Sequence, residues 1–323
     1  MNEPKNHHIV PESYLKQFAD SKDELFRVKT KEIPQKIKNG ILNSSSLKKF
    51  NVSQICYKEY FYKIQNNPML GIQDVTDEYQ IEKESFKWYE NNLEQIIQNI
   101  RNRQAYFNLK DAEILCKGLL NIKIRNNYFR ESVLNKENTK EFLDNILESL
   151  PSIIQENKDA IEYFDKMKAD FDENSLLINQ LQNKSLLDNI SNGDRAINKI
   201  YNLCIDSEWT ILETTINDMF ITSDNPGFCI DENDKLENTK FGDLFIWYFP
   251  LTPFHCLKVN KMVNETFTSL KPLNFINVDS ELVKMINIST CYLANTDIYS
   301  NSQTTIFKNW IEFNKHKNSK NNN

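Results

Sequence analysis

The sequence predicts an α+β fold, in which strands near the two ends of the chain form one mixed sheet and a large helical section lies between them. Short runs rich in β-branched and aromatic residues occupy the first 70 residues. From about residue 75 to 205 the apolar residues recur with a helical period. Strand-like patterns return after Ser207. Because two or three N-terminal strands cannot bury themselves alone, we expect them to join the C-terminal strands.

The first section, residues 1–70, opens with an extended segment that turns into a helix at Pro11. Proline is favoured in the first turn of a helix, where its missing N–H costs nothing. Residues 25–28 and 56–62 are typical of strands, and Asn66-Asn67-Pro68 breaks the pattern.

The middle section, residues 75–205, is predicted to be helical throughout. Its clearest element is amphipathic, with apolar side chains in a single stripe at Phe86, Tyr89, Leu93, Ile96, Ile97 and Ile100. A second helix is expected to start at Asn108 and to carry its apolar face as far as Val133. Weaker helical patterns cover residues 139–149, 158–170 and 174–204.

The third section, residues 207–316, is predicted to be rich in strands, at residues 209–213, 219–222, 228–230, 245–249 and 255–259. Residues 231–240 are polar and are expected to form an exposed hairpin loop. Asp279 is the predicted N-cap of a helix that continues to about Leu293, and a last helix is expected near 303–315. The polar residues 317–323 are expected to form a flexible tail.

Composition excludes several classes of protein. With 40% hydrophobic and 11% aromatic residues among 323, the chain can bury a substantial core and is not a disordered protein. Its net charge of -6 argues against a broad basic surface for nucleic acid, although a local basic groove is compatible with it. The six cysteines are scattered without a CxxC pair, which is typical of reduced core thiols.

Neither a membrane segment nor a secretion signal is predicted. No apolar run reaches the roughly 18 residues that a membrane span needs, and the first residues lack the apolar stretch of a signal peptide. We therefore expect a cytoplasmic protein without a membrane partner.

Two of the four histidines, His7 and His8, stand side by side where the extended start becomes a helix. Histidine can transfer a proton or bind a metal near neutral pH. On an extended segment the two rings point to opposite faces, so one pocket can easily receive only one of them. Either one histidine is a metal ligand or general base, or both are structural residues that bond to neighbouring carbonyls. An HNH-type nuclease motif begins similarly, but the next histidine here is His255.

A second polar motif, Thr222-Ser223-Asp224-Asn225-Pro226-Gly227, ends a predicted strand. In α/β enzymes, catalytic groups are often presented at the ends of strands. The carboxylate of Asp224 has this position and is therefore a candidate catalytic group. Ser223 and Asn225 beside it are candidates for binding a substrate. The structural alternative is a tight turn, because Asp and Asn before Pro are common turn formers.

Two charged residues of the helical section fall on or beside apolar faces. Glu82 projects onto the stripe that starts at Phe86, so either a cation pairs with it or the helix begins later and Glu82 is solvated. The planar guanidinium of Arg125 could donate two parallel hydrogen bonds to a phosphate or a carboxylate. Its structural alternatives are a surface position or an ion pair with Glu82 or Asp224.

These landmarks together resemble an uncharacterised, mainly bacterial family, domain of unknown function 4238. The resemblance rests on motifs that run over nearly the whole chain: His7–Pro11 with Tyr14, Leu15 and Phe18, then Tyr60–Tyr62, Ile81-Glu82, the helix with Arg125, Trp209, Ile221–Pro226 and Phe249–Pro253. The resemblance implies an architecture but does not indicate a function. A role in bacterial conflict or phage defence follows from association alone.

Distant motifs converge when strands from both ends share a sheet, so we expect the histidines and Asp224 to meet in one pocket roofed by Glu82 and Arg125. The first hypothesis is a phosphodiester hydrolase, a metal-dependent nuclease-like enzyme. Its catalytic groups would be His7, His8, Asp224 and Glu82, with His8, Asp224 and Glu82 as candidate ligands of a divalent metal. Its substrate, a nucleic acid or nucleotide, would contact Arg125, Ser223 and Asn225.

The alternative hypothesis is a non-catalytic sensor or interaction protein that binds a small ligand or a protein partner. No GxSxG, HExxH, P-loop or GxGxxG pattern occurs in the chain. A bound metal, or a deep pocket that unites the candidate residues, would distinguish the enzyme from the binding protein.

Overall fold

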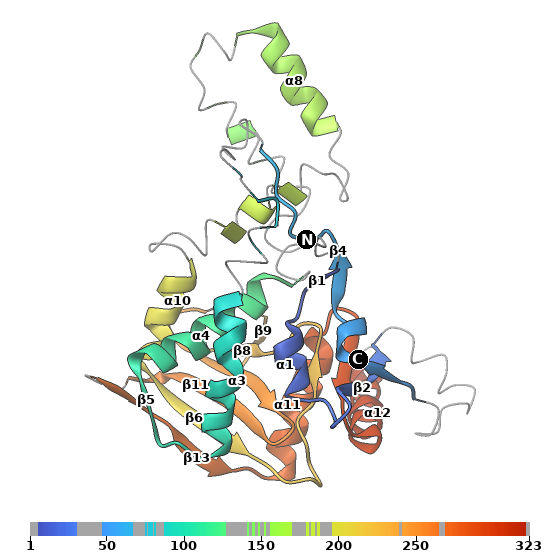
Figure 1. Ribbon diagram of the computed structural model, residues 1–323, viewed down its shortest axis with the longest axis vertical. Coiled ribbons are helices and arrows are strands. Elements are labelled where there is room, and N and C mark those ends of the chain that lie inside the picture. The colour runs from blue at the N-terminus through green and yellow to red at the C-terminus, as the bar shows by residue number, and fades with distance from the viewer. Residues whose placement is uncertain are drawn as a thin grey trace.

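The protein is described by a computed structural model that covers residues 6–30, 47–66, 87–126, 156–169, 196–238, 241–264 and 269–320. Scattered positions between 75 and 81 and between 141 and 187 are also described. Figure 1 shows the arrangement of the elements in space. The α+β class predicted from the sequence is confirmed.

The larger sheet has six strands in the order β13-β6-β11-β10-β8-β9. All of its strands come from the C-terminal section: β6 (Ser207–Glu213), β8 (Phe228–Asp231), β9 (Leu236–Glu237), β10 (Phe245–Thr252), β11 (His255–Asn264) and β13 (Asn274–Asn277). Neighbouring strands are antiparallel except β13, which runs parallel to β6 at the edge. Residues 231–240, expected to be a loop, contain β9 as the return strand of a hairpin.

Strands from both ends of the chain meet, as expected, but they do so in a separate antiparallel sheet and not in one mixed sheet with the other C-terminal strands. This smaller sheet has the order β3-β2-β14-β7, formed by β2 (Glu24–Lys29), β3 (Lys49–Asn51), β7 (Thr222–Ser223) and β14 (Asp297–Ser300). Strand β14 is central, pairing with β2 on one side and β7 on the other. Two further pairs complete the strands, β1 (Asn6–His8) with β4 (Tyr57–Glu59) and β5 (Tyr106–Asn108) with β12 (Leu270–Pro272).

Helices cover both faces of the six-stranded sheet, because its strands are apolar on both faces. Trp247 and Phe249 on β10 belong to the large core cluster that also contains residues of α3 (Lys87–Arg101), α4 (Leu109–Ile124) and α10 (Ala196–Ile205). Tyr248, which lies between them, points to the opposite face and packs with Ile286 of α11 (Ser280–Leu293). Figure 1 shows α3 and α4 crossing the near face of the sheet. The result is three layers, helix on sheet on helix.

Several helix boundaries follow from identifiable caps. The side chain of Asn108 accepts a hydrogen bond from the Asp111 N–H at the start of α4, and Asp279 accepts one from the Leu282 N–H at the start of α11. The short helix α1 (Glu12–Lys16) follows Pro11 as predicted. The weaker pattern over 158–170 corresponds to α8 (Lys158–Ala169).

Other expectations are changed by the structure or fall outside it. Helix α12 (Gln303–Lys320) continues through four residues of the segment expected to be a flexible tail. Helix α4 ends at Ile124, and the predicted continuation to Val133 lies outside the described residues. Glu82 also lies outside them. None of the helices in the described part of the chain combines the length and the apolar character that crossing a membrane requires.

Candidate functional site

The two histidines of β1 have different surroundings, as their alternation on a strand predicts. His7 is fully buried, and its Nδ1 accepts a hydrogen bond of 2.8 Å from the Tyr62 N–H. Its ring stacks on Tyr62, with 5.6 Å between the centroids, and meets the ring of Tyr79 edge-on. These contacts favour the structural alternative for His7, because its ring holds the chain after β4 in place.

His8 points to the other side, toward charged groups of three helices. Burial lowers the pKa of this imidazole, and nearby Arg125 lowers it further, whereas Glu12 and Glu90 act in the opposite direction. Its Nε2 atom is buried and accepts or donates no hydrogen bond among the described residues. A neutral ring with an unused nitrogen is the state that a general base requires.

Arg125 lies at the end of α4 and is 1% exposed. Its Nη1 contacts the Glu90 carboxylate of α3 at 2.5 Å, and its Nη2 donates to the His8 carbonyl oxygen. The guanidinium also lies over the ring of Tyr62. Arg125 therefore forms an ion pair, and the acid that the described residues provide for it is Glu90 and not Asp224. Glu82, the other expected partner, lies outside the described residues. Arg125 joins α3, α4 and β1, and this accounts for its burial.

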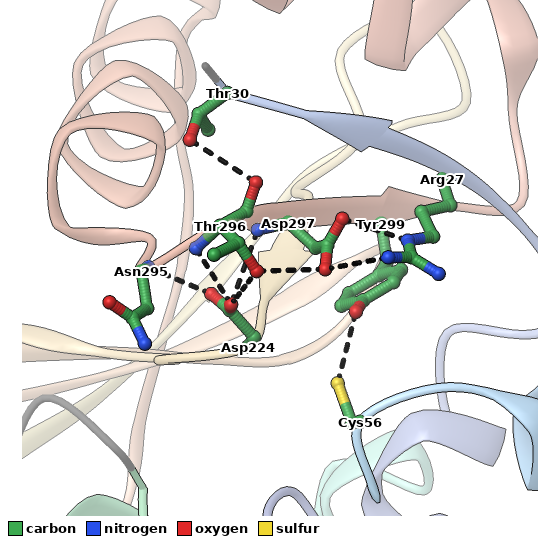
Figure 2. A network of polar contacts seen from close by, with 8 residues as sticks. All are labelled: Arg27, Thr30, Cys56, Asp224, Asn295, Thr296, Asp297 and Tyr299. Atoms are coloured by element: carbon green, nitrogen blue, oxygen red, sulfur yellow. Dashed lines mark hydrogen bonds and ion pairs between the residues drawn. The ribbon is translucent and has the colours of Figure 1, made fainter. Parts of the chain in front are cut away.

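The Asp224 carboxylate is saturated by hydrogen bonds from the turn that leads into β14, as Figure 2 shows. Its Oδ1 accepts from the Asn295 N–H at 2.8 Å, and its Oδ2 accepts from the N–H and hydroxyl of Thr296, both at 2.8 Å, and from the Asp297 N–H at 3.2 Å. Burial raises the pKa of Asp224, while the bonds from Thr296 counteract this increase. Asp224 thus anchors this turn.

Asp297 stands beside Asp224 and pairs with Arg27 of β2. The guanidinium contacts both carboxylate oxygens, Nε to Oδ1 at 2.8 Å and Nη2 to Oδ2 at 3.1 Å. This two-point geometry fixes both side chains. On the same strand as Asp297, the Tyr299 hydroxyl accepts a hydrogen bond of 3.1 Å from the Cys56 thiol. Strand β14 therefore presents a row of polar groups between the two ends of the chain (Figure 2).

These groups border a cavity of about 430 Å³, which we name the Asp224 cavity. Its walls come from the segment after β1, from β2, from the loop leading into β4, and from the end of β7 and the start of β14. The lining residues are Ile9, Arg27, Gln54, Ile55, Cys56, Tyr57, Lys58, Asp224, Asn295, Thr296, Asp297 and Tyr299. The cavity is large enough for a small organic ligand.

Within the part of the chain that the structure describes, the histidine rings and Asp224 do not share a pocket, which corrects that part of the prediction, while Glu82 lies outside this part. Ile9 lines the Asp224 cavity, but neither histidine ring is among its described lining residues. The rings turn away because β1 directs His7 into the core and His8 toward Glu90 and Arg125. Among the described residues, no three His, Cys, Asp or Glu side chains are close enough together to hold a metal ion.

The other two candidates of this turn, Ser223 and Asn225, are buried and engaged within the protein. The Ser223 hydroxyl accepts from the Asn225 N–H. The Asn225 side-chain oxygen accepts from Lys123 and Asn126 of the α4 end, and its NH₂ group donates to the Leu293 carbonyl. Asn126 therefore connects the helix that carries Arg125 to the turn that carries Asp224. This arrangement supports the structural alternative for Ser223 and Asn225.

Three important residues were not identified from the sequence: Arg27, Lys123 and Asp297. Lys123 carried a detectable signal, because it falls four residues after Leu119 on the apolar face of α4. Arg27 carried only a weak signal as a charge within a strand-like run. Asp297 carried none, because its role depends on how β14 pairs with β2 and β7.

The fold and the site define an α+β protein with a three-layer core and a polar cavity where the two ends of the chain meet. The chain belongs to the family described as "Protein of unknown function (DUF4238)", whose model matches residues 6–304. The comparison with curated proteins finds no match, and the comparison with solved structures finds none either.

Proposed function

We propose that the protein binds a small polar ligand in the Asp224 cavity. The observation that carries this proposal is that segments from the two ends of the chain enclose a cavity of about 430 Å³ lined by charged, amide and aromatic side chains. A polar cavity of this size is a typical ligand site, in which a few fixed polar groups determine orientation. The paired Arg27 and Asp297 provide such fixed groups.

The backbone at the cavity wall supports the same proposal. Cys56 has a φ of 54°, a left-handed conformation that is costly for a residue with a side chain. Strained positions of this kind cluster at ligand sites, where the surrounding structure holds them. Burial keeps the pKa of the Cys56 thiol well above its usual value, so the cysteine acts here as a neutral wall group and not as a nucleophile.

A cavity-blocking variant tests the proposal. Gln54 lines the cavity and is exposed, so Gln54→Trp should fill part of the cavity without disturbing the core. A library of small polar compounds is screened by thermal shift against the wild type, and the hits are repeated on the variant. We expect their stabilisation to disappear in Gln54→Trp and to persist in Gln98→Trp, an exposed position on α3. Hits that stabilise both variants equally would refute the proposal.

Phosphodiester hydrolysis is the second candidate function, and the observation that favours it is the state of His8. Its ring is neutral at pH 7 because burial lowers its pKa, and its buried Nε2 is unused among the described residues. In this proposal His8 takes a proton from a water as its oxygen bonds to phosphorus, the P–O bond to the leaving alcohol breaks, and the protonated imidazole returns the proton to the leaving oxygen. The metal dependence expected from the sequence stays a prediction, because Glu82, one of its three candidate ligands, lies outside the described residues.

The hydrolase proposal is tested by incubating the purified protein with single- and double-stranded DNA and RNA. His8→Ala should lower the rate roughly a hundredfold or more while leaving the melting temperature close to that of the wild type. His7→Ala is the matched variant, and it should lower the melting temperature because the Tyr62 N–H loses its acceptor. Equal rates in the wild type and His8→Ala would remove His8 from the mechanism. The proposed role in phage defence is checked by plaque counts on cells that express the same two proteins.

A further inference from the structure

The two carboxylates of the Asp224 cavity have little capacity left for a ligand. Each oxygen of Asp224 already accepts at least one hydrogen bond, and Oδ2 accepts three. Both oxygens of Asp297 accept from Arg27, and Oδ2 lies beside the Thr296 hydroxyl, whose single hydrogen it shares with Asp224. A cationic ligand would have to displace these donors, which lie on the backbone or on a paired side chain. The cavity is therefore poorly suited to a cation.

The unused capacity consists of donors. Arg27 contacts Asp297 through Nε and Nη2, so its Nη1 has no acceptor among the described residues. The Tyr299 hydroxyl and the Cys56 thiol carry two hydrogens but share a single hydrogen bond, which leaves one hydrogen for a further acceptor. Tyr299 is 1% exposed, so bulk water does not readily supply that acceptor.

The formal charges that line the cavity balance, with Arg27 and Lys58 against Asp224 and Asp297, so the preference for an anion rests on which groups have hydrogens left to donate. Lys58 of β4 lines the cavity along with Arg27, so two cations come from two different strands. The negative charge of Asp297 is matched at contact distance by Arg27, and that of Asp224 is spread over four hydrogen bonds. An arginine that has used one edge on a carboxylate can bind a second oxygen group along its other edge.

We infer that the ligand of the Asp224 cavity carries an anionic oxygen group, a phosphate or a carboxylate, which contacts Arg27 Nη1 and lies within the field of Lys58. This inference rests on the proposed ligand-binding function and deepens it by naming the chemical class of the ligand. The Tyr299–Cys56 pair donates its remaining hydrogen to the same ligand. The cavity volume leaves room for a larger organic part beyond the anionic group.

Calorimetric titration with four probes tests the inference: inorganic phosphate, acetate, adenosine monophosphate and neutral adenosine. We expect one or both classes of anion to bind, and adenosine monophosphate to bind at least tenfold more tightly than adenosine. Binding should weaken as ionic strength rises, since the attraction is screened. Phosphate binding without acetate binding identifies phosphate as the group, and the reverse result identifies carboxylate.

Variants separate this inference from the proposed function. Lys58→Gln changes an exposed residue and should weaken binding of the anionic probes several-fold, whereas Lys110→Gln, an exposed lysine of α4, should not. Arg27→Lys keeps a positive charge but removes the second edge, and it should weaken binding of the anionic probes by tenfold or more. Because the change also loses the two-point contact with Asp297, the titration is run well below the melting temperature of the variant, so that unfolding does not account for the loss.

Two outcomes would overturn the inference. If no anionic probe binds, or if adenosine binds as tightly as its monophosphate and Lys58→Gln has no effect, the ligand is not an anion. The proposed function still stands in that case if library hits are lost in Gln54→Trp. Hits that survive in Gln54→Trp mean that the proposed function itself has failed.

Discussion

At the scale of single residues, Gly227 is the position least tolerant of a side chain. It has a φ of 77°, a conformation that favours glycine, and a Cβ built there would lie 2.3 Å from Cδ2 of the Phe249 ring. Phe249 is itself buried and packed between Tyr14 and Trp247. The turn after Asp224 therefore approaches the sheet as closely as a backbone without a side chain allows.

We expect Gly227→Ala to lower the free energy of unfolding by about 2 kcal/mol or more, from backbone strain and the clash with Phe249 together. Gly118→Ala is the matched control, because the added Cβ would meet only ordinary contacts at 3.8 Å or longer. In the interior of α4 that change should stabilise the protein by up to about 1 kcal/mol. Urea denaturation measures both, and equal effects would contradict the proposed geometry.

Lys123 is a fully buried lysine that contacts no carboxylate among the described residues. Its ammonium donates to Asn225 Oδ1 at 2.7 Å, to the Gly227 carbonyl at 2.8 Å and to Asn238 Oδ1 at 2.6 Å. These three neutral acceptors satisfy its hydrogens. Burial nevertheless lowers the pKa of Lys123 to about 7, because the charge has left water.

This lowered pKa predicts how stability depends on pH. Between pH 7 and the ordinary lysine pKa the unfolded chain holds the proton more firmly than the folded protein, so stability rises as pH rises through this window. From pH 7 to 9 the contribution of Lys123 should be on the order of 2 kcal/mol. Lys123→Met should lose this rise, measured as the difference in unfolding free energy between the two pH values. An unchanged rise would mean that the lysine remains charged in the fold.

At the scale of elements, the ion pair of Arg125 and Glu90 connects α4 to α3 and, through the His8 carbonyl, to β1. The arginine is buried, while the side chain of Glu90 is 29% exposed. Partial solvation of the acid lowers the cost of breaking the pair below that of a fully buried one. The pair nevertheless positions β1, and with it the side chain of His8.

We expect Arg125→Gln to destabilise the protein by about 2–4 kcal/mol. The double-mutant cycle with Glu90→Gln should give a coupling of about 1–3 kcal/mol, because the two side chains are in direct contact. The surface pair of Lys16 and Glu12 on α1, whose side chains are 43% and 37% exposed, provides the comparison, with an expected coupling below about 1 kcal/mol. Similar couplings for the two pairs would show that Arg125 is not buried as described.

At the scale of the whole molecule, Tyr14 ties together the motifs that carry the family resemblance. Its hydroxyl lies 2.9 Å from the Thr222 hydroxyl and donates to the Pro250 carbonyl at 2.7 Å. Thr222 begins the turn motif and Pro250 belongs to the Phe249–Pro253 motif. One buried side chain thus joins α1 to β7 and to β10, which is a physical reason for these distant segments to occur together.

We expect Tyr14→Phe to cost about 1–3 kcal/mol, because the Pro250 carbonyl would be buried without its donor. Since the hydroxyl connects the two ends of the chain, the loss should appear as one shifted transition by both circular dichroism and tryptophan fluorescence. Tyr106→Phe, at a tyrosine that is 55% exposed, should leave stability within about 0.5 kcal/mol. Separate transitions in Tyr14→Phe would indicate that the N-terminal section folds independently.

The features predictable from the sequence were those set by local periodicity and capping. The stripe of Leu93, Ile96, Ile97 and Ile100 is buried on α3, and Asp279 caps α11. The runs of aromatic and β-branched residues at 209–213 and 245–249 predicted β6 and β10. Opposite faces for His7 and His8 followed from the alternation of side chains on β1. Such patterns depend only on residues that are close in sequence, within one or two helical turns or a few strand residues. They can therefore be recognised without knowledge of the tertiary structure.

Tertiary structure alone decided which polar residues meet. The short strand β14 was not predicted, because four residues carry too little pattern, yet its pairing with β2 and β7 brings Arg27, Asp224 and Asp297 together. The pairing of Arg125 with Glu90 was likewise decided by the packing of α3 on α4. By itself the sequence determined the fold class and its two polar motifs. Contacts between residues up to 270 positions apart decided the site, because they depend on register and packing that no local pattern records.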